Sequence, residues 1–228
     1  MKSNQCSQLV AITGGSGAGK TWLADRLQRL FGGQAGRITQ DSFYRDRSHL
    51  SPEERSRINF DHPDALDWDC FRETLQAMAE GRETRVPVYD FGTHCRTAGT
   101  EAVRPRPIMI VDGLWLLHHP EVRRLFSLGI FVHCPSDERL RRRVVRDTSE
   151  RGRTETSVHA QFRETVAPMH DLFVGPQVHH ADLVIPFPHH DITDLHAALW
   201  RLLPGDREPS RSRAGFRLEL QSLLQPAA

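Results

Sequence analysis

A glycine-rich stretch, GGSGAGKT at residues 14–21, constrains the fold of this chain more than any other feature. It follows a short apolar run at 8–13, QLVAIT, which is typical of a buried β-strand. From Lys20 onward, apolar residues recur at three- and four-residue spacing, and glycines at 32 and 33 end this helical pattern. The stretch matches the P-loop pattern G-x-x-x-x-G-K-[ST], and the flanking strand and helix are the context that a P-loop requires, so the sequence predicts an α/β fold around a phosphate site.

The lysine of this stretch is unusual in the chain. Lys and Arg residues total 30, yet only Lys2 and Lys20 are lysine. A lysine ammonium is compact, whereas an arginine guanidinium is a broad planar fork, so a tight ring of backbone N–H donors favours lysine. We expect the ammonium to reach the β- and γ-phosphates of a bound nucleotide. The predicted phosphate-binding residues are Gly14, Gly15, Ser16, Gly17, Ala18, Gly19, Lys20 and Thr21.

Two residues are candidates for Mg²⁺ contacts. The Thr21 hydroxyl ends the P-loop, and Asp112 directly follows the apolar run PIMIV, at the expected end of a strand. A carboxylate at that place can also cap a helix, so both roles stay open for Asp112. The 13 histidines lack an organised metal spacing, and no histidine metal site is expected.

Further short apolar runs end at Thr39, Val111, Val132 and Ile185, with helical patterns between them. Strands that alternate with helices predict a parallel sheet covered on both faces. The expected helices span residues 67–80, 120–127, 136–149, 155–172 and 191–203. Residues 84–106 break the pattern and predict an inserted β-hairpin. We therefore expect one domain over 1–203, followed by a linker-like tail over 204–228 with the composition of a disordered segment.

Charge and cysteine content narrow the class of protein. The net charge of +1 argues against a polyanion binder by charge alone, so no nucleic-acid partner is expected. The four cysteines are scattered, which argues against a zinc site or a disulfide framework and favours a reducing compartment. No apolar stretch approaches the roughly 20 residues that span a bilayer. We expect a cytoplasmic protein with no membrane partner.

Asp41 is the candidate catalytic carboxylate. It follows the weak strand that ends at Thr39, and ligands of open α/β sheets gather at the carboxyl ends of strands. A carboxylate near the γ-phosphate can accept the proton of an attacking hydroxyl. Considered alone, an aspartate at this place is more often a helix cap or a turn residue.

An arginine-rich stretch, RLRRRVVRDTSERGRT, begins at Arg139. On a helix, four of its arginines share one face, which fits a solvated helix face or a nucleic-acid surface. A third interpretation fits the P-loop better, because residues 147–156 are polar, contain Gly152 and can close over a bound triphosphate as a lid. Arginines brought in by closure would neutralise the transferring phosphoryl group.

Six motifs occur in the order and approximate spacing of uridine kinases, also called uridine–cytidine kinases, and the chain resembles this family over about residues 7–186. They are GGSGAGKT, QDSFYRD, NFDHPDALD, PVYDFGTHCR, VDGLWLL and RRVVRDTSERGRT, and PMHDLFVGP and ADLVIP extend the likeness. PVYDF-x-x-H-x-R is the most specific motif, because related kinases for pantothenate, ribulose 5-phosphate or nicotinamide riboside differ there. The family normally carries Glu where this chain has Asp112.

The resemblance implies a P-loop NMP-kinase-like three-layer fold with a five-stranded parallel sheet, an inserted β-hairpin and an Arg-rich lid. It implies transfer of the γ-phosphoryl group of Mg-ATP, or of GTP, to the 5′-hydroxyl of uridine or cytidine in pyrimidine salvage. Family members often assemble as tetramers.

The resemblance also assigns residue roles. Asp41 serves the 5′-hydroxyl, and the lid cations are Arg146, Arg151 and Arg153. The ribose contacts are Asp61, Arg143 and Gln161. The base-edge contacts are Tyr89 and His94, and the aromatic wall of the pocket is formed by Tyr44, Phe60 and Phe91.

Other functions stay open at this point. A related P-loop kinase could act on another hydroxyl, as pantothenate, nicotinamide riboside and ribulose 5-phosphate kinases do. From a different class, the P-loop could serve a regulatory nucleotide switch, which would hydrolyse slowly without an acceptor. An RNA-binding role for the arginine stretch ranks last, because the net charge is close to zero.

Overall fold

The computed structural model describes residues 6–188 and residue 195. Of the predicted helix over 191–203, only Leu195 is described, and the predicted tail over 204–228 lies outside the described residues. Among the described residues, no helix combines the length and the apolar character needed to cross a bilayer.

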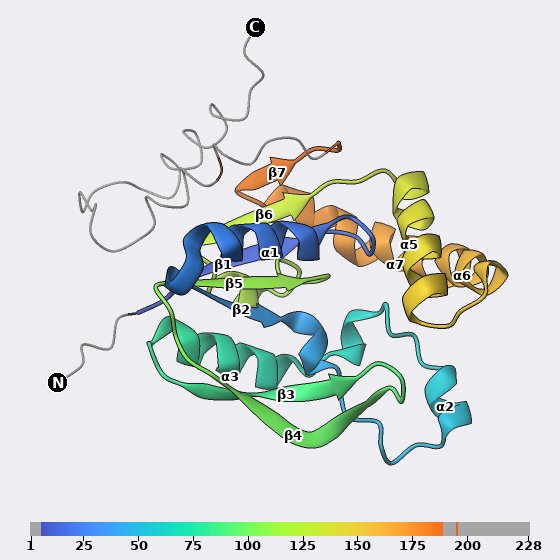
Figure 1. Ribbon diagram of the computed structural model, residues 1–228, viewed down its shortest axis with the longest axis horizontal. Helices are drawn as coiled ribbons and strands as arrows, with labels where there is room; N and C mark the ends of the chain where they lie inside the picture. Colours follow the sequence, from blue (N-terminus) through green and yellow to red (C-terminus); the bar gives the residue numbers. More distant parts are fainter. Residues whose placement is uncertain (1–5, 189–194, 196–228) are drawn as a thin grey trace, which may run out of the picture.

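Five parallel strands form the central sheet (Figure 1), as the sequence predicts. Their order is β2-β5-β1-β6-β7, so β1 and β5 are interior strands that end next to each other. Along this pair, Thr13 of β1 lies in register with Gly113 of β5. The strands are β1 (Gln8–Thr13), β2 (Ala35–Thr39), β5 (Ile108–Gly113), β6 (Leu128–Val132) and β7 (Leu183–Ile185).

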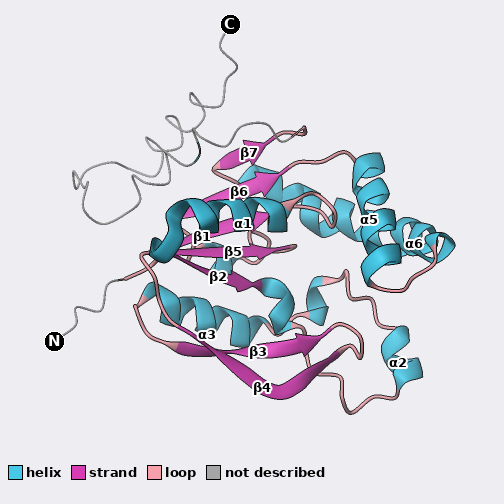
Figure 2. Cartoon of the chain, viewed as in Figure 1, coloured by secondary structure: helices cyan, strands magenta, loops and turns pink. Residues whose placement is uncertain are grey.

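Helices cover both faces of the sheet (Figure 2). Successive side chains of a strand point to opposite faces, and β1 is apolar on both. Val10 and Ile12 belong to the core cluster of α1 (Lys20–Phe31), while Leu9 and Ala11 belong to the cluster of α3 (Trp68–Ala79). This two-sided burial explains why β1 reads as a continuous apolar run. It also makes the three-layer prediction correct.

The predicted insertion forms a two-stranded antiparallel hairpin of β3 (Thr84–Asp90) and β4 (Cys95–Val103). In Figure 1 this hairpin runs beside α3, away from the central sheet. Its turn contains His94, the one non-glycine residue with positive φ (56°) among the described residues. Backbone conformations of this kind are uncommon outside glycine and often mark functional positions.

The remaining helices differ in part from the predictions. α4 (Pro120–Arg123) ends four residues before the predicted end, and α2 (Pro52–Ser56) was not predicted. α5 (Ser136–Glu150) agrees closely with the predicted helix over 136–149.

The predicted helix over 155–172 is present, but it is irregular and continues past its predicted end. It starts as α6 (Glu155–Gln161), passes through π-helical turns on both sides of α7 (Ala167–Met169), and continues as a 3₁₀ turn to His180. Pro168 and Pro176 lack the N–H that a regular helix needs, which explains the altered hydrogen-bond pattern.

Packing of α1 offers a direct test of the fold. Leu27 is fully buried against the sheet, whereas Leu30 on the same helix is 41% exposed. We expect Leu27→Ala to lower the free energy of unfolding by about 2–5 kcal/mol, because it leaves a cavity in the core. Leu30→Ala should change it by about 0.5 kcal/mol or less. Urea denaturation followed by circular dichroism measures both; equal effects would contradict the assigned core.

Candidate active site

The P-loop connects β1 to α1 by a backbone path that favours glycine at three positions, Gly14, Gly17 and Gly19, which all have positive φ. Gly14 and Gly17 have φ values of 149° and 82°. A Cβ atom at Gly14 would lie 2.5 Å from the carbonyl oxygen of Val132, and one at Gly17 would lie 2.7 Å from that of Arg139. The loop therefore packs directly against β6 and α5, which fixes its curvature around the predicted phosphate position.

Lys20 lies at the first turn of α1, and its Nζ donates a hydrogen bond to the carbonyl oxygen of Gly15 at 3.0 Å. Burial lowers the pKa of this ammonium to about 8, against the opposing attraction of Asp41 and Asp112. A lysine, a catalytic-carboxylate candidate and a metal-ligand candidate, each from a different element, therefore share one electrostatic site.

Asp41 lies on a 3₁₀ turn, Gln40–Phe43, directly after β2. Burial raises the pKa of its carboxyl group; Lys20 acts in the opposite direction, and Asp112 adds to the increase. Arg146 and Arg151 also lower the pKa of Asp41. The carboxyl group thus lies within electrostatic range of both the P-loop lysine and the arginine-rich segment.

Gln40, which sequence reasoning missed, fixes this turn. It is fully buried, and its Oε1 accepts a hydrogen bond from the backbone N–H of Trp115 at 2.9 Å. A Cβ atom at Gly113 would lie 2.4 Å from the Cβ of Gln40, so the glycine allows the turn to approach β5. In the sequence, only its position directly before Asp41 could have indicated a role for Gln40.

Asp112 is the penultimate residue of β5 and is 4% exposed, so the strand ends two residues later than predicted. Arg37 of β2, also missed in the sequence, donates from Nε to Oδ1 of Asp112 at 3.0 Å and forms a second ion pair with Asp25 of α1. Thr21 is exposed beside Lys20. A hydroxyl and a carboxylate are hard oxygen donors of the kind that Mg²⁺ prefers, so these residues fit a magnesium ion.

The aromatic residues predicted for the acceptor pocket form one cluster. Ring centroids lie 5.2 Å apart for Tyr44 and Tyr89, 4.7 Å for Phe60 and His94, and 5.3 Å for Tyr89 and Phe91. Within the described residues, the buried hydroxyl of Tyr89 has no hydrogen-bond partner, and burial raises the pKa of this phenol to about 12. A buried donor without a partner suits a polar group on a ligand.

The residues assigned to the ribose also come together. Arg143 is 5% exposed and donates to Oε1 of Gln161 at 2.9 Å and to Oγ of Ser16 at 2.7 Å. Burial raises the pKa of Asp61, while Arg143 and Arg153 act to lower it. Arg143 therefore connects the P-loop to the acceptor side.

An unpredicted carboxylate, Asp147 of α5, organises the arginines. It is fully buried and forms ion pairs with Arg146 at 2.8 Å, Arg143 at 3.3 Å and Arg151 at 3.7 Å. Burial works to raise its pKa, but the hydrogen bond from Arg146 and the neighbouring cations hold that pKa below its ordinary value. In the sequence, the spacing of four residues between Arg143 and Asp147 could have indicated an ion pair on one face of a helix.

The other lid arginines take separate positions. Arg153 donates to Gln161 and Ser157, and the guanidinium of Arg151 lies 5.7 Å from the ring centroid of Phe91 on the hairpin. Arg139 is only 3% exposed. The interpretation of the stretch as a solvated helix face is therefore wrong for Arg139 and Arg143.

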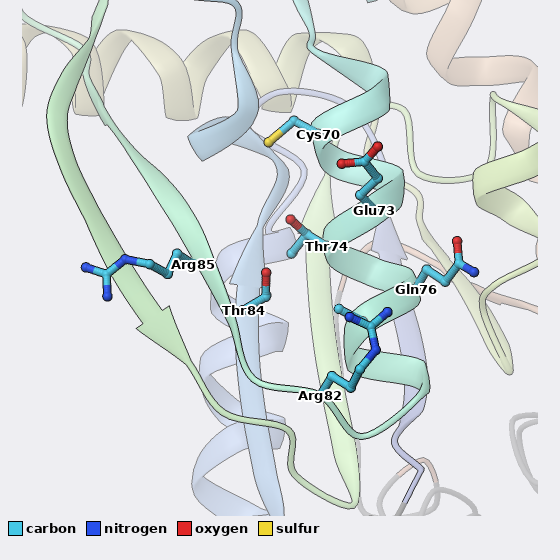
Figure 3. A pocket seen from close by; sticks show the side chains of 8 residues that line it. Cys70, Glu73, Thr74, Gln76, Arg82, Thr84 and Arg85 are labelled. Atoms are coloured by element: carbon cyan, nitrogen blue, oxygen red, sulfur yellow. The ribbon is translucent and has the colours of Figure 1, made fainter.

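A separate cavity of about 430 Å³ lies between α3 and β3 (Figure 3). It shares no residue with the predicted site. Its lining residues are Cys70, Glu73, Thr74, Gln76, Ala77, Arg82, Thr84 and Arg85.

Comparison with known proteins identifies the family. The model of the Phosphoribulokinase / Uridine kinase family matches residues 9–193. The chain belongs to this family. A uridine kinase of Vibrio atlanticus is 41% identical over 189 residues, covering 81% of this chain and 88% of that protein. Uridine kinases of Clostridium perfringens and Chloroflexus aggregans are each 42% identical, over 178 and 179 residues, covering 78% of this chain and 86% of each relative.

Solved structures support the same fold for this kinase family member. A phosphoribulokinase from Rhodobacter spheroides has a TM-score of 0.62 at 18% identity, covering 81% of this chain and 71% of that one. A D-glycerate 3-kinase from Cryptococcus neoformans has a TM-score of 0.58 at 14% identity, covering 82% and 88%. The predicted P-loop kinase fold is confirmed.

The lowered pKa of Lys20 predicts proton uptake on nucleotide binding. Near pH 8 the free protein holds this amine about half-protonated. A bound triphosphate favours the ammonium and raises its pKa, so ATP binding should take up protons near pH 8 and fewer at pH 6.5. Isothermal titration calorimetry in buffers of different ionisation enthalpy measures the uptake. A binding enthalpy that is independent of the buffer at pH 8 would contradict the assigned environment of Lys20.

Proposed function

We propose that this protein is a nucleoside kinase that transfers the γ-phosphoryl group of Mg-ATP to the 5′-hydroxyl of uridine or cytidine, giving UMP or CMP. The observation that carries the proposal is the position of Asp41, within electrostatic range of Lys20 and on the turn directly before Tyr44 of the aromatic cluster. The uridine kinases at 41–42% identity support the acceptor class.

In the proposed reaction, the 5′-oxygen forms a bond to the γ-phosphorus, the bond from this phosphorus to the β,γ-bridging oxygen breaks, and ADP leaves. The proton of the 5′-hydroxyl passes to Asp41. Because burial raises the pKa of Asp41, this carboxylate is a stronger base than an exposed one.

Cations supply charge stabilisation. Lys20 would contact the β- and γ-phosphates, and Arg146, Arg151 and Arg153 would be drawn to the transferring group from the lid. Arg146 and Arg151 are paired with Asp147, so their transfer to phosphate exchanges one anionic partner for another rather than leaving a buried charge unpaired. Thr21 and Asp112 would hold Mg²⁺, which neutralises phosphate charge when bound.

The acceptor pocket fits a pyrimidine nucleoside. Asp61 accepts hydrogen bonds and therefore suits the vicinal 2′- and 3′-hydroxyls, with Arg143 and Gln161 beside it. The unpaired hydroxyl of Tyr89 would bond to the edge of the base. Burial lowers the pKa of His94, and the nearby Arg55 adds to the decrease, so its imidazole is neutral at pH 7 and can donate or accept a hydrogen bond there.

The donor, compartment and assembly are further parts of the proposal. We expect ATP to be the phosphoryl donor, and GTP is the alternative donor to test. The scattered cysteines favour the cytoplasm. We also propose a homo-oligomer, because members of the family often assemble as tetramers.

A coupled ADP-release assay tests the function. We expect uridine and cytidine to give ADP well above background, with UMP or CMP identified by mass spectrometry. Pantothenate, nicotinamide riboside and ribulose 5-phosphate serve as competing acceptors. Higher activity with any of these would replace the proposed substrate, and slow hydrolysis unaffected by every acceptor would favour a nucleotide switch.

Asp41→Asn tests the catalytic role. We expect kcat to fall by about 10²–10⁴-fold, because the proton acceptor is lost. The KM for ATP should stay close to that of the parent. The folded pKa of Asp41 is raised, so its ionised form costs stability above that pKa, and the variant should unfold at the same or a higher temperature at pH 7.

The matched control is Asp64→Asn, which changes a carboxylate whose side chain is 91% exposed and should retain full activity. If Asp41→Asn weakened ATP binding by as large a factor as it lowered kcat, Asp41 would have a structural role instead of a catalytic one.

A further inference from the structure

Arg96, in the specific motif PVYDF-x-x-H-x-R, has no role in the proposed chemistry. It lies on β4 two residues after His94 and pairs in register with Tyr89 of β3. The two residues proposed to bond to the edge of the base are therefore its immediate neighbours in the hairpin. Arg96 therefore lies at the same end of the hairpin as the residues proposed to bind the base.

The side chain of Arg96 leaves the hairpin and crosses to the segment that follows Asp41. Its Nε donates to the carbonyl oxygen of Tyr44 at 2.8 Å, and its Nη2 donates to that of Phe43 at 3.2 Å. Its Nη1 forms an ion pair with Oδ2 of Asp67 at 3.1 Å. One guanidinium, 19% exposed, therefore joins three segments.

The backbone of Arg96 adds to this connection. Its N–H donates to Oδ1 of Asp46 at 3.3 Å. Within the described residues, every hydrogen bond that the structure records between the hairpin and residues 40–46 comes from Arg96. Ring packing of Tyr44 on Tyr89 is the apolar part of the same junction.

Other hydrogen bonds hold this segment to Trp115 after β5 and to residues 60–67 before α3. The N–H of Asp67 donates to the carbonyl oxygen of Phe43 at 2.9 Å, and the N–H of Arg45 donates to that of Ala65 at 2.9 Å. Neither bond involves Arg96, so we expect its loss to loosen the contact between the hairpin and the segment without unfolding either.

We propose that Arg96 is a positioning residue that couples the acceptor-binding hairpin to the backbone segment carrying Asp41. An acceptor that fills the base pocket orders Tyr89 and His94, and Arg96 transmits that order to the backbone two and three residues after Asp41. The coupling rests on the proposed function, because it needs a nucleoside at the hairpin. It makes base recognition a condition for correct placement of the catalytic carboxylate.

Steady-state kinetics of Arg96→Met, with uridine and ATP varied separately, test the coupling. We expect kcat to fall by about 10- to 100-fold and the KM for uridine to rise, because small displacements of a catalytic group cost rates of this order. The KM for ATP should change by less than about twofold, since the polar partners of Arg96 outside its hairpin, among the described residues, are Phe43, Tyr44, Asp46 and Asp67, none of them in the P-loop. A purely structural role would change both KM values together and lower the melting temperature in proportion.

Two further variants sharpen the result. Arg96→Lys keeps a cation for Asp67 but cannot reach two carbonyl oxygens with a planar fork, so only part of kcat should return. Arg85→Met is the matched control, because Arg85 lies on β3 and its side chain, in the part of the chain that the structure describes, donates only to Thr100 of the same hairpin. It should behave as the parent.

Hydrogen–deuterium exchange of the ligand-free variants separates this proposal from the proposed function. Peptides covering residues 41–46 should exchange faster in Arg96→Met than in the parent or in Arg85→Met, whatever the substrate. Unchanged exchange there together with unchanged kcat would overturn the positioning role. Faster exchange in a protein that phosphorylates no nucleoside would keep the structural coupling and reject the proposed function.

Discussion

The rest of the site depends on one half-buried ammonium. Lys20 stands where the first turn of α1 meets the carboxyl ends of β2 and β5, and its charge is shared between Asp41 and Asp112. Burial disfavours the charged form of each group. It lowers the pKa of Lys20 and raises the pKa of Asp41. A triphosphate would add negative charge where the ammonium is incompletely compensated. The free protein is therefore electrostatically prepared for the proposed ligand.

The same principle governs the opposite side of the site. Asp147 is fully buried and pairs with Arg143, Arg146 and Arg151, so these three arginines are oriented in the free protein. Such a network is stable only while every member keeps a partner. Arg143 also donates to Ser16 and Gln161, so one side chain joins the P-loop to residues proposed for the ribose. The buried charge of Arg143 therefore connects two parts of the candidate site.

Short-range patterns carried most of the predictions. The strand and helix around GGSGAGKT, the hairpin and the five strands of the sheet follow from apolar periodicity and from glycines that interrupt it. The helix after Glu155 was predicted less well, because Pro168 and Pro176 change its hydrogen bonding instead of ending it. The site residues other than those of the P-loop came mainly from resemblance: an isolated Tyr89 or Phe91 has the same pattern as a core residue. Their roles remain predictions that the geometry supports.

The amino-acid sequence is sufficient to predict the phosphate loop, the alternation of strands and helices, and the residue types available for phosphoryl transfer. These depend on neighbours within about one helical turn, where periodicity and glycine conformation act directly. Only the tertiary structure decided which charges meet: Arg37 with Asp112, Asp147 with three arginines, and Arg96 with the carbonyl oxygens of Phe43 and Tyr44. Residues 53 positions apart become partners there, because burial removes water as the competing hydrogen-bond partner and leaves only the groups that the fold brings together.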